Sequence, residues 1–473
     1  MRFLPTSSPR CERPSYDGLD VVLKLSQLVD QRLVIWGAGL DGSAAVERLA
    51  PNNQVHLVVD DPETNAAAQA LAVRFSVPLS APTPELLAAQ DLIVRAPGVS
   101  RYRDDVTRSA HVGVPSSNLA ALWMADDHAG CVIGVTGTKG KSTTSHLTHL
   151  LLVAAGVSAD LGGNIGVPVL ELDETSSFHV VEISSYMAAD MQRSPDVGVL
   201  TNLGEDHLPW HGSIARYQAD KLNLFAHDRL RSLVVSGADA PALAATHEHQ
   251  HRIISGASHD GGSSSGWRVD GPAVRSDGRV VALDGSPLAR IHFALDLCAA
   301  LTAAEVAIRS RLPVAAIERV VADYRTLPSR LEPVAVIDGV EYVDDALASN
   351  PFGTCAALAA YPGRSVVLIL GGADRGVDLS PLTAAITLHG APVAVVLFSE
   401  TVPRFSQVLD HAGITFEVHA GGDVAGAVRL ARDLAEPDSV VLFSPAVPTP
   451  TALGNYRDRS AAFKSAVASL SPA

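Results

Sequence analysis

Closely spaced cysteines are missing from this sequence. The 473 residues contain four cysteines, Cys11, Cys131, Cys298 and Cys355, and no two of them form a CxxC pair. Zinc ribbons and disulfide-stapled scaffolds depend on close or regular cysteine spacing, so both classes are excluded. A reducing cytoplasm is therefore the expected compartment.

Features of membrane and nucleic-acid proteins are also lacking. Residues 1–18 are polar and contain prolines, without the apolar centre of a secretory leader. We expect no run to approach the roughly 20 apolar residues that span a bilayer. The formal net charge of −15 opposes attraction to nucleic acid or to an anionic membrane surface. We therefore expect neither partner, and an anionic ligand would need positive charge gathered locally.

The sequence does contain regular alternation of strand-like and helix-like segments. A chain of this length is too long to fold around a single hydrophobic core. Of its residues 47% are apolar, although only 5% are aromatic. Short runs rich in branched residues are separated by helical stretches rich in Ala and Leu, which predicts an α/β fold with mainly parallel sheets. We predict three domains, at residues 1–127, 128–324 and 325–473. The predicted strands are residues 33–36, 56–59, 91–94, 131–135, 179–182, 198–202, 365–370, 392–398 and 439–443.

The sharpest motif is VTGTKGKST at residues 135–143, between a predicted strand and a helical run at 144–155. A glycine-rich turn there directs backbone N–H groups into one concavity at a helix N-terminus, which attracts phosphate. Lys141 would reach the β- and γ-phosphates, and the Ser142 hydroxyl would bind Mg²⁺. Val135 stands where the strict motif has glycine. The predicted ATP contacts are Gly137, Thr138, Lys139, Gly140, Lys141, Ser142 and Thr143.

Further motifs follow in a fixed order along the chain. TGTKGKST is followed by GGNIG at 162–166, VEISSY at 181–186 and DHLPWHGS…YQADKL at 206–222. This series resembles the central ATPase domain of the Mur ligases, which build the peptidoglycan stem peptide. The resemblance extends to both ends, so it covers essentially the whole chain. The flanking motifs are VIWGAGLDG at 34–42, LPSRLE at 327–332, DDALASNP at 344–351, GGADRGVDLSPL at 371–382 and FSPAVPTPTALGNYRDRSAAF at 443–463.

The resemblance implies a three-domain ligase and a reaction. The N-terminal domain would be Rossmann-like and bind a UDP-linked precursor, the central one a P-loop ATPase-type parallel sheet, and the C-terminal one Rossmann-like. ATP would phosphorylate a substrate carboxylate, which the amine of an amino acid then attacks. The C-terminal motifs are most similar to the glutamate-adding member. The implied substrates are UDP-N-acetylmuramoyl-L-alanine and glutamate, with ATP and Mg²⁺, for a monomer in the cytoplasm.

The resemblance also implies a metal centre. Glu182 and His207 match the metal ligands of the family. Lys221 matches a lysine whose amine is carbamylated, which turns a cation into a carboxylate-like ligand and requires a lowered pKa. Ser142 would complete the set, and Asn164 would line the substrate or ATP side, where it is predicted to contact the UDP precursor.

The outer domains carry the remaining implied contacts. Arg330 would contact ATP phosphate and Asp345 the ribose. A GxGxxG turn such as that of residues 37–42 is by itself weak and would suggest a nicotinamide enzyme, but beside a phosphate loop it is better interpreted as the site of the UDP pyrophosphate. The predicted UDP-precursor contacts are Gly37, Ala38, Gly39, Asp60 and Gly98. The predicted glutamate contacts are Arg375, Thr449 and Tyr456.

Several positions depart from the D-glutamate-adding pattern. Leu347 and Arg375 each stand where those enzymes have lysine, and Lys139 replaces an asparagine of their phosphate loop. Phe293 and Asp296 replace two asparagines near the adenine side. These changes surround the amino-acid pocket and the nucleotide rim, whereas the metal residues are kept. The pattern favours ligases that add L-glutamate, whose product a separate epimerase inverts.

Three alternatives stay open. A folylpolyglutamate synthase shares the second and third domains but lacks the UDP-binding first domain. A non-catalytic ligase-like subunit would explain Leu347 and Phe293, although Lys141, Glu182 and Lys221 are retained. A nicotinamide dehydrogenase leaves the phosphate loop unexplained.

Overall fold

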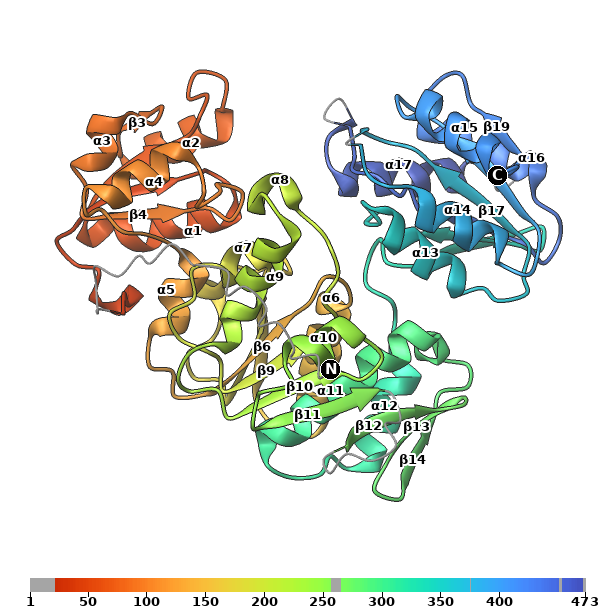
Figure 1. Cartoon of the computed structure of the whole chain (residues 1–473), viewed down its shortest axis with the longest axis horizontal. Helices are drawn as coiled ribbons and strands as arrows, with labels where there is room; N and C mark the ends of the chain where they lie inside the picture. Colours follow the sequence, from red (N-terminus) through yellow and green to blue (C-terminus); the bar gives the residue numbers. More distant parts are fainter. Residues whose placement is uncertain (1–21, 257–264, 375, 451–452, 471–473) are drawn as a thin grey trace, which may run out of the picture. The chain divides into compact units, whose positions relative to one another are not determined.

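The protein is described here by a computed structural model that covers residues 22–256, 265–374, 376–450 and 453–470. The chain divides into two compact units. Three sheets dominated by parallel strands alternate with helices, which confirms the α/β class (Figure 1). The predicted domain boundaries at 127 and 324 remain predictions. The first unit comprises Met1–Arg268, Ser276–Gly278 and Asp296–Ile317, and the second comprises Val269–Arg275, Arg279–Leu295 and Glu318–Ala473.

The first unit begins with a five-stranded sheet in the order β3-β2-β1-β4-β5, with every neighbouring pair parallel. This is the strand order of doubly wound nucleotide-binding sheets. The strands are β1 (Arg32–Trp36), β2 (Gln54–Val58), β3 (Leu79–Ser80), β4 (Leu92–Arg95) and β5 (Ser116–Asn118). The helices are α1 (Leu40–Leu49), α2 (Ala66–Phe75), α3 (Pro84–Ala88), α4 (Asp104–His111) and α5 (Leu119–Ala125).

Both faces of this sheet are buried. Successive side chains of a strand point to opposite faces, so Leu33 and Ile35 pack on one side and Val34 and Trp36 on the other. Helix α5, which is apolar all round, has every residue buried and belongs to the same core cluster as residues of the second sheet, such as Val132. A shared core around α5 therefore joins the first two sheets in one unit.

The second sheet holds the predicted phosphate loop. Six parallel strands lie in the order β11-β10-β9-β6-β8-β7, and β12 pairs with β11. The strands are β6 (Cys131–Thr136), β7 (Ala159–Gly163), β8 (Phe178–Glu182), β9 (Val197–Leu200), β10 (Ser232–Ser236), β11 (Arg252–Gly256) and β12 (Ser265–Asp270), followed by β13 (Ala273–Ser276) and β14 (Arg279–Ala282). The helices are α6 (Lys141–Ala154), α7 (Ser185–Ala188), α8 (Leu208–His211), α9 (Ile214–Leu222), α10 (Ala240–Ala245), α11 (Ile291–Ile308) and α12 (Val314–Asp323).

One expectation from the sequence is wrong. Helix α11 is long and apolar enough to cross a membrane by length and composition, although no such run was expected. In the structure 56% of it is buried, and two of its polar side chains bond to the rest of the first unit. Asp296 accepts from Thr144 Oγ1 at 3.2 Å, and Glu305 accepts from Trp267 Nε1 at 3.1 Å. Such contacts are those of a core helix.

The second unit contains a six-stranded sheet in the order β15-β16-β20-β17-β18-β19. The β15–β16 pair is antiparallel and the other pairs are parallel. Inward side chains such as Ile369 and Phe443 pack against α16 and α17. The strands are β15 (Glu332–Ile337), β16 (Val340–Asp344), β17 (Val366–Leu370), β18 (Val393–Leu397), β19 (Phe416–Val418) and β20 (Val440–Phe443). The helices are α13 (Pro351–Ala359), α14 (Ser380–Thr387), α15 (Val402–His411), α16 (Val424–Leu434) and α17 (Tyr456–Ala468).

Candidate active site

The phosphate loop connects β6 to α6, as the sequence predicted. Gly137 and Gly140 have φ angles of +154° and +79°, and α6 begins immediately after Gly140. A Cβ atom on Gly137 would lie 1.8 Å from Thr201 Oγ1, so this position admits glycine alone. The loop therefore presents the N-terminus of a 14-residue helix, whose partial positive charge favours phosphate.

Residues at the end of β9 hold this loop in place. The backbone N–H of Lys139 donates to Asn202 Oδ1 at 2.8 Å, and Thr201 Oγ1 donates to the Lys139 carbonyl at 2.5 Å. Thr138 Oγ1 lies 2.9 Å from the Tyr217 hydroxyl. No motif in the sequence pointed to these three supports. Thr201 and Asn202 could have been found, because polar residues directly after a buried strand lie at the edge where parallel sheets bind ligands.

Lys141 and Lys221 lie against the same part of the loop. Lys141 Nζ donates to the Gly137 carbonyl at 2.9 Å, and Lys221 Nζ donates to that oxygen at 3.0 Å. Lys221 is only 1% exposed. Burial lowers the pKa of Lys221 well below its ordinary value, and the charge of Lys141 lowers it further. The Lys221 amine is therefore disposed to be neutral, as carbamylation requires.

Glu182 ends β8, beside β6. Its Oε1 atom accepts a hydrogen bond from Asn164 Nδ2 at 2.6 Å. Its Oε2 atom is buried and has no hydrogen-bond partner among the described residues. Buried carboxylate oxygens normally have a partner, so this oxygen is one that a cation could satisfy.

His207 precedes α8 in the left-handed backbone region, with φ +54°. Its ring lies 4.8 Å from the ring of Tyr186, and its side chain is 48% exposed. Loss of hydration lowers the pKa of His207 to about 4, although Asp206 opposes this shift. A neutral imidazole can bind a cation, and its exposed edge leaves the ring accessible.

These residues form one electrostatic group. The charges of Lys141 and Glu182 influence the pKa of Lys221, and those of Asp206 and Lys141 influence the pKa of His207. No cluster of three or more His, Cys, Asp or Glu suited to a metal occurs in the described chain. Glu182 and His207 are the two members of that kind in the predicted set, and Lys221 would become a third only after carbamylation. The free Glu182 oxygen and the neutral His207 and Lys221 fit a divalent cation, whose binding here remains a prediction.

The glycine turn of the first sheet leaves open space. Gly37 has φ +114° and packs so tightly that a Cβ would lie 2.7 Å from the Cβ of Ala96. A Cβ on Gly39 or on Gly98 would meet nothing within 4 Å. Gly39 caps α1, and Ala38 before it is half-buried. The Asp60 carboxylate, predicted to contact the nucleoside, pairs with Arg103 at 2.9 Å.

In the second unit, Arg330 and Asp345 lie close enough to interact. Asp345 follows β16, and its two oxygens accept from Ser444 Oγ at 2.7 Å and from the Leu331 N–H at 3.2 Å. Burial raises the pKa of Asp345 to about 7, against the lowering effect of Ser444, Leu331 and the Arg330 charge. A carboxyl with this pKa is partly protonated near neutral pH.

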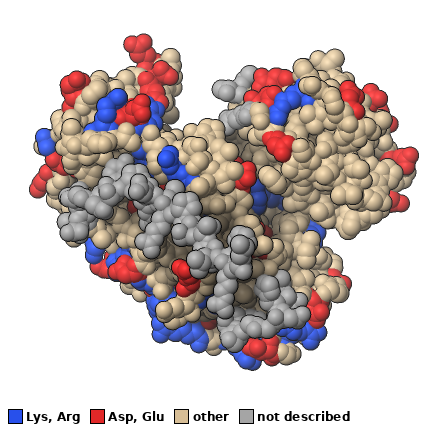
Figure 2. Space-filling view, viewed as in Figure 1, with Lys and Arg blue, Asp and Glu red and all other residues tan. Residues whose placement is uncertain are grey.

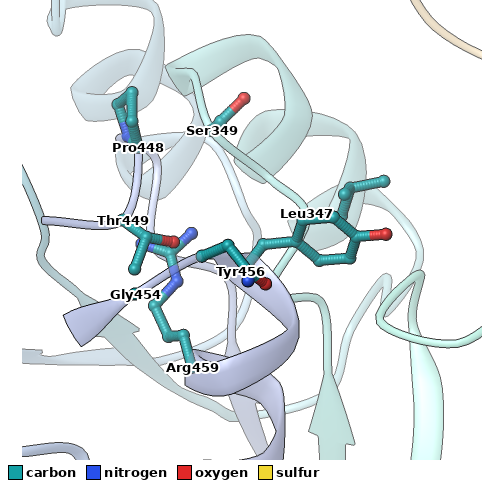
Figure 3. A pocket seen from close by; sticks show the side chains of 8 residues that line it. Leu347, Ser349, Pro448, Thr449, Gly454, Tyr456 and Arg459 are labelled. Carbon is teal, nitrogen blue, oxygen red and sulfur yellow. The ribbon is translucent and has the colours of Figure 1, made fainter. Parts of the chain in front are cut away.

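A pocket of about 260 Å³ in the second unit brings together Thr449 and Tyr456, two of the predicted glutamate contacts (Figure 3). Arg375, the third, lies outside the described residues. Arg459 also lines the pocket, is 1% exposed, and donates to the carbonyls of Val447 and Ala346 at 3.1 and 2.7 Å. Burial lowers the pKa of Arg459 to about 10. This buried arginine was not predicted from the sequence. The full lining is Leu347, Ser349, Pro448, Thr449, Gly454, Asn455, Tyr456 and Arg459.

Comparisons with known proteins support the resemblance seen in the motifs. Residues 135–297 match the Mur ligase middle domain, and residues 329–447 match the Mur ligase glutamate ligase domain. The UDP-N-acetylmuramoyl-L-alanine–L-glutamate ligase of a Micromonospora species is 37% identical over 94% of this chain and 98% of its own. The same enzyme from Salinispora tropica is 36% identical over 94% and 99%.

A solved structure shows the same fold. The crystal structure of MurF from Acinetobacter baumannii covers 95% of this chain and 92% of its own, with a TM-score of 0.56 at 17% identity. The resemblance noted in the motifs is thus confirmed along nearly the full length. The chain belongs to the Mur ligase family, ATP-dependent amino-acid ligases of peptidoglycan precursor synthesis.

Proposed function

We propose that this chain joins L-glutamate to UDP-N-acetylmuramoyl-L-alanine at the expense of ATP. The relatives that match nearly its whole length carry that name. The structural observation that supports it is the buried Lys221 amine on the carbonyl of Gly137, beside the phosphate-loop Lys141. A P-loop alone would fit many nucleotide enzymes, whereas a buried lysine with a lowered pKa fits the carbamylated ligand of glutamate-adding ligases.

The first chemical step is phosphoryl transfer. The γ-phosphoryl group of ATP passes to the alanine carboxylate, so a new P–O bond forms and ADP leaves. The N–H groups at the start of α6 would hold the triphosphate, and Lys141 would turn from the Gly137 carbonyl towards the β- and γ-phosphates. Ser142, Glu182, His207 and carbamylated Lys221 would hold Mg²⁺, which supplies charge neutralisation for the transferred group.

The second step is amide formation. The glutamate amine attacks the carbonyl carbon of the acyl phosphate, phosphate leaves, and the nitrogen loses a proton. Tyr456 and Thr449 would contact glutamate in the pocket of Figure 3, where the buried Arg459 supplies positive charge for a carboxylate. Leu347 lines the same pocket and presents an apolar side chain where D-glutamate-adding enzymes have lysine. This difference supports L-glutamate as the substrate. We also propose Arg375 as a glutamate contact, on the basis of its motif.

The UDP portion would bind at the first sheet. The open space at Gly39 and Gly98 would admit a pyrophosphate near the start of α1. Asp60 would leave its ion pair with Arg103 and contact the ribose or uracil. Arg330 and Asp345 would contact ATP phosphate and ribose. Acidic and basic side chains are interspersed on the face that Figure 2 shows, in keeping with small anionic ligands held by local groups. We propose a cytoplasmic monomer whose product passes to a separate epimerase.

One experiment tests the proposal. The purified chain receives ATP, Mg²⁺ and UDP-N-acetylmuramoyl-L-alanine with either L- or D-glutamate, and phosphate release and product mass are measured. We expect amide formation with L-glutamate and none in the absence of acceptor. Product with D-glutamate alone would reverse the choice of isomer. Glutamylation of a reduced folate, without turnover of the UDP precursor, would favour a folylpolyglutamate synthase.

A further inference from the structure

Four side chains from separate segments form one hydrogen-bonded chain beside the phosphate loop. The Tyr102 hydroxyl donates to Asp220 Oδ1 at 2.7 Å, and Asp220 Oδ2 lies 2.6 Å from His211 Nδ1. His211 Nε2 lies 2.9 Å from Ser185 Oγ. His211, Ser185 and Asp220 are 0%, 2% and 8% exposed. The chain is therefore shielded from water over most of its length.

The chemistry of the groups fixes the direction of the two bonds to Asp220. An ionised carboxylate accepts only, so the Tyr102 hydroxyl and His211 Nδ1–H both donate to Asp220. The other ring nitrogen, Nε2, contacts the Ser185 hydroxyl. Both ring nitrogens of His211 thus have partners inside the protein, which fixes the orientation of the ring.

Each member is attached to an element of the candidate active site. Ser185 opens α7, three residues after Glu182. His211 is the last residue of α8, whose N-cap is His207. Asp220 directly precedes Lys221 in α9. The four hydrogen-bonded side chains therefore connect the three segments that carry Glu182, His207 and Lys221.

The Tyr102 end belongs to the loop that follows β4 of the first sheet. Two further bonds attach this loop to α8. Trp210 Nε1 donates to the Pro97 carbonyl at 3.0 Å, and Ser100 Oγ donates to the Trp210 carbonyl at 2.8 Å. Gly98, a proposed contact of the UDP precursor, lies between them in sequence. A substrate bound at this loop would thus be linked, through these hydrogen bonds, to the segments around Lys221.

A serine hydrolase has the same order of groups, Ser–His–Asp. That function does not suit this arrangement, because Ser185 is 2% exposed and its hydroxyl faces His211 within the protein interior. The geometry instead matches a structural support, because the bonds link the segments that carry Glu182, His207 and Lys221.

We propose that His211 and Asp220 are positioning residues that hold Glu182, His207 and Lys221 in one arrangement for a divalent cation. The effect on turnover rests on the proposed ligase function, whereas the effect on Mg²⁺-dependent nucleotide binding does not. Loss of a hydrogen bond that orients a metal ligand lowers metal affinity or activity about 10- to 100-fold, and we expect an effect of that order when the supporting bonds of His211 are lost.

The test compares three variants of the full chain. H211F keeps an aromatic ring and removes both nitrogens, H211N keeps a donor near the position of Nδ1, and Y102F removes the hydroxyl at the far end. The affinity for ADP is measured by calorimetry over a series of Mg²⁺ concentrations, and the Mg²⁺ requirement of turnover is measured in parallel. We expect H211F to raise the required Mg²⁺ concentration about 10- to 100-fold. H211N should recover part of that loss, and the KM for glutamate should stay unchanged.

The matched control is H149F. His149 lies on α6 and its Nε2 contacts the Ala159 carbonyl at 3.1 Å, apart from the four-residue chain. An equal Mg²⁺ dependence of ADP binding in the unaltered chain, H211F and H211N would overturn the positioning role, even if H211F melts at a lower temperature. If H211F does not fold, the Mg²⁺ dependence of ADP binding in H211N and Y102F tests the positioning role. If no amide forms with either glutamate isomer while H211F still weakens Mg²⁺-dependent binding, the ligase proposal fails and the positioning role stands.

Discussion

Lys141 and Lys221 share an acceptor, the carbonyl oxygen of Gly137, to which they donate at 2.9 and 3.0 Å. Two ammonium groups that converge on one oxygen repel each other, and the more buried one is the easier to neutralise. Lys221 is 1% exposed, and its pKa is lowered well below the ordinary value by burial first and by Lys141 second. Of the two amines, Lys221 is therefore the one disposed to be neutral.

Replacement of Lys141 by Met should abolish most ATP-dependent phosphate release. The variant keeps the side-chain length and removes the positive charge that would face the β- and γ-phosphates. Removal of one such electrostatic group typically lowers kcat about 10²- to 10³-fold. Phosphate release under saturating substrates is the measurement, and K24M, which alters an ion pair with Asp127 away from the loop, is the control. Unchanged turnover in K141M would remove the phosphate role of Lys141.

Replacement of Lys221 by Ala should remove activity that short carboxylic acids restore. The variant leaves a space where formate or acetate can take the place of a carbamate, whereas chloride cannot. Turnover is measured with each anion at constant ionic strength. The same acids should not help K141M, which serves as the comparison. An L-glutamate-dependent rate equal to that of the unaltered chain, without any added acid, would show that Lys221 holds no metal.

Replacement of Asn164 by Ala should raise the Mg²⁺ concentration needed for half-maximal turnover by about tenfold. Asn164 Nδ2 is the donor that holds Glu182 Oε1 at 2.6 Å, so its loss frees the carboxylate to rotate. N65A is the control, because Asn65 caps α2 and its loss costs about 1 kcal/mol of stability. Equal Mg²⁺ curves for N164A and N65A would argue that Asn164 does not orient Glu182.

Replacement of Tyr456 by Ala should raise the KM for glutamate about tenfold, equivalent to roughly 1.4 kcal/mol, with a smaller effect on that for ATP. The cap of α17 is formed by Asn455 and Asp458, so the helix start is preserved. Initial rates with each substrate varied in turn give both constants. R429A changes an exposed arginine of α16, outside the pocket lining, and should behave as the unaltered chain. A parallel rise in both constants for Y456A would contradict a glutamate pocket.

Asp345 should make stability depend on pH. Its pKa is about 7 in the folded chain against a reference value of 3.8, so the folded state binds more protons between these values. The stabilising contribution of the protonated carboxyl is complete below pH 4 and is lost as the pH rises towards 7, at up to about 1.4 kcal/mol per pH unit. D345N cannot titrate, so its Tm relative to the unaltered chain should be higher at pH 8 than at pH 5. D323N, at an exposed position, is the control. A constant Tm difference from pH 5 to pH 8 would refute the shift.

The sequence predicted the sheets and the phosphate loop because both depend on local patterns. Short branched runs bounded by turns became β1, β6 and β17, and the glycine-rich turn at Gly137 lies where the strand ends. Family motifs also placed Glu182, His207 and Lys221, which the structure brings into one electrostatic group.

Side-chain pairing across the fold was not predictable. His211 and Asp220 meet because Gly212, with φ +81°, turns α8 back towards α9, and no spacing rule states which faces of two short helices coincide. The ion pair of Asp60 with Arg103 joins residues 43 positions apart. The apolar composition of α11 did not reveal whether its surroundings are lipid or protein. In each case the contact depends on residues that are separate in the sequence and are brought together only by the fold.

The crowding at Gly137 limits how this enzyme can change. A methyl group there would sit 1.8 Å from the Thr201 hydroxyl, and the backbone angle of +154° already suits glycine alone. An inhibitor that hydrogen-bonds to the Gly137 carbonyl would therefore meet a point that resistance mutations cannot reshape directly. Resistance would have to come from substitution of Thr201, Lys141 or Lys221. Such a substitution would also disturb the binding of ATP.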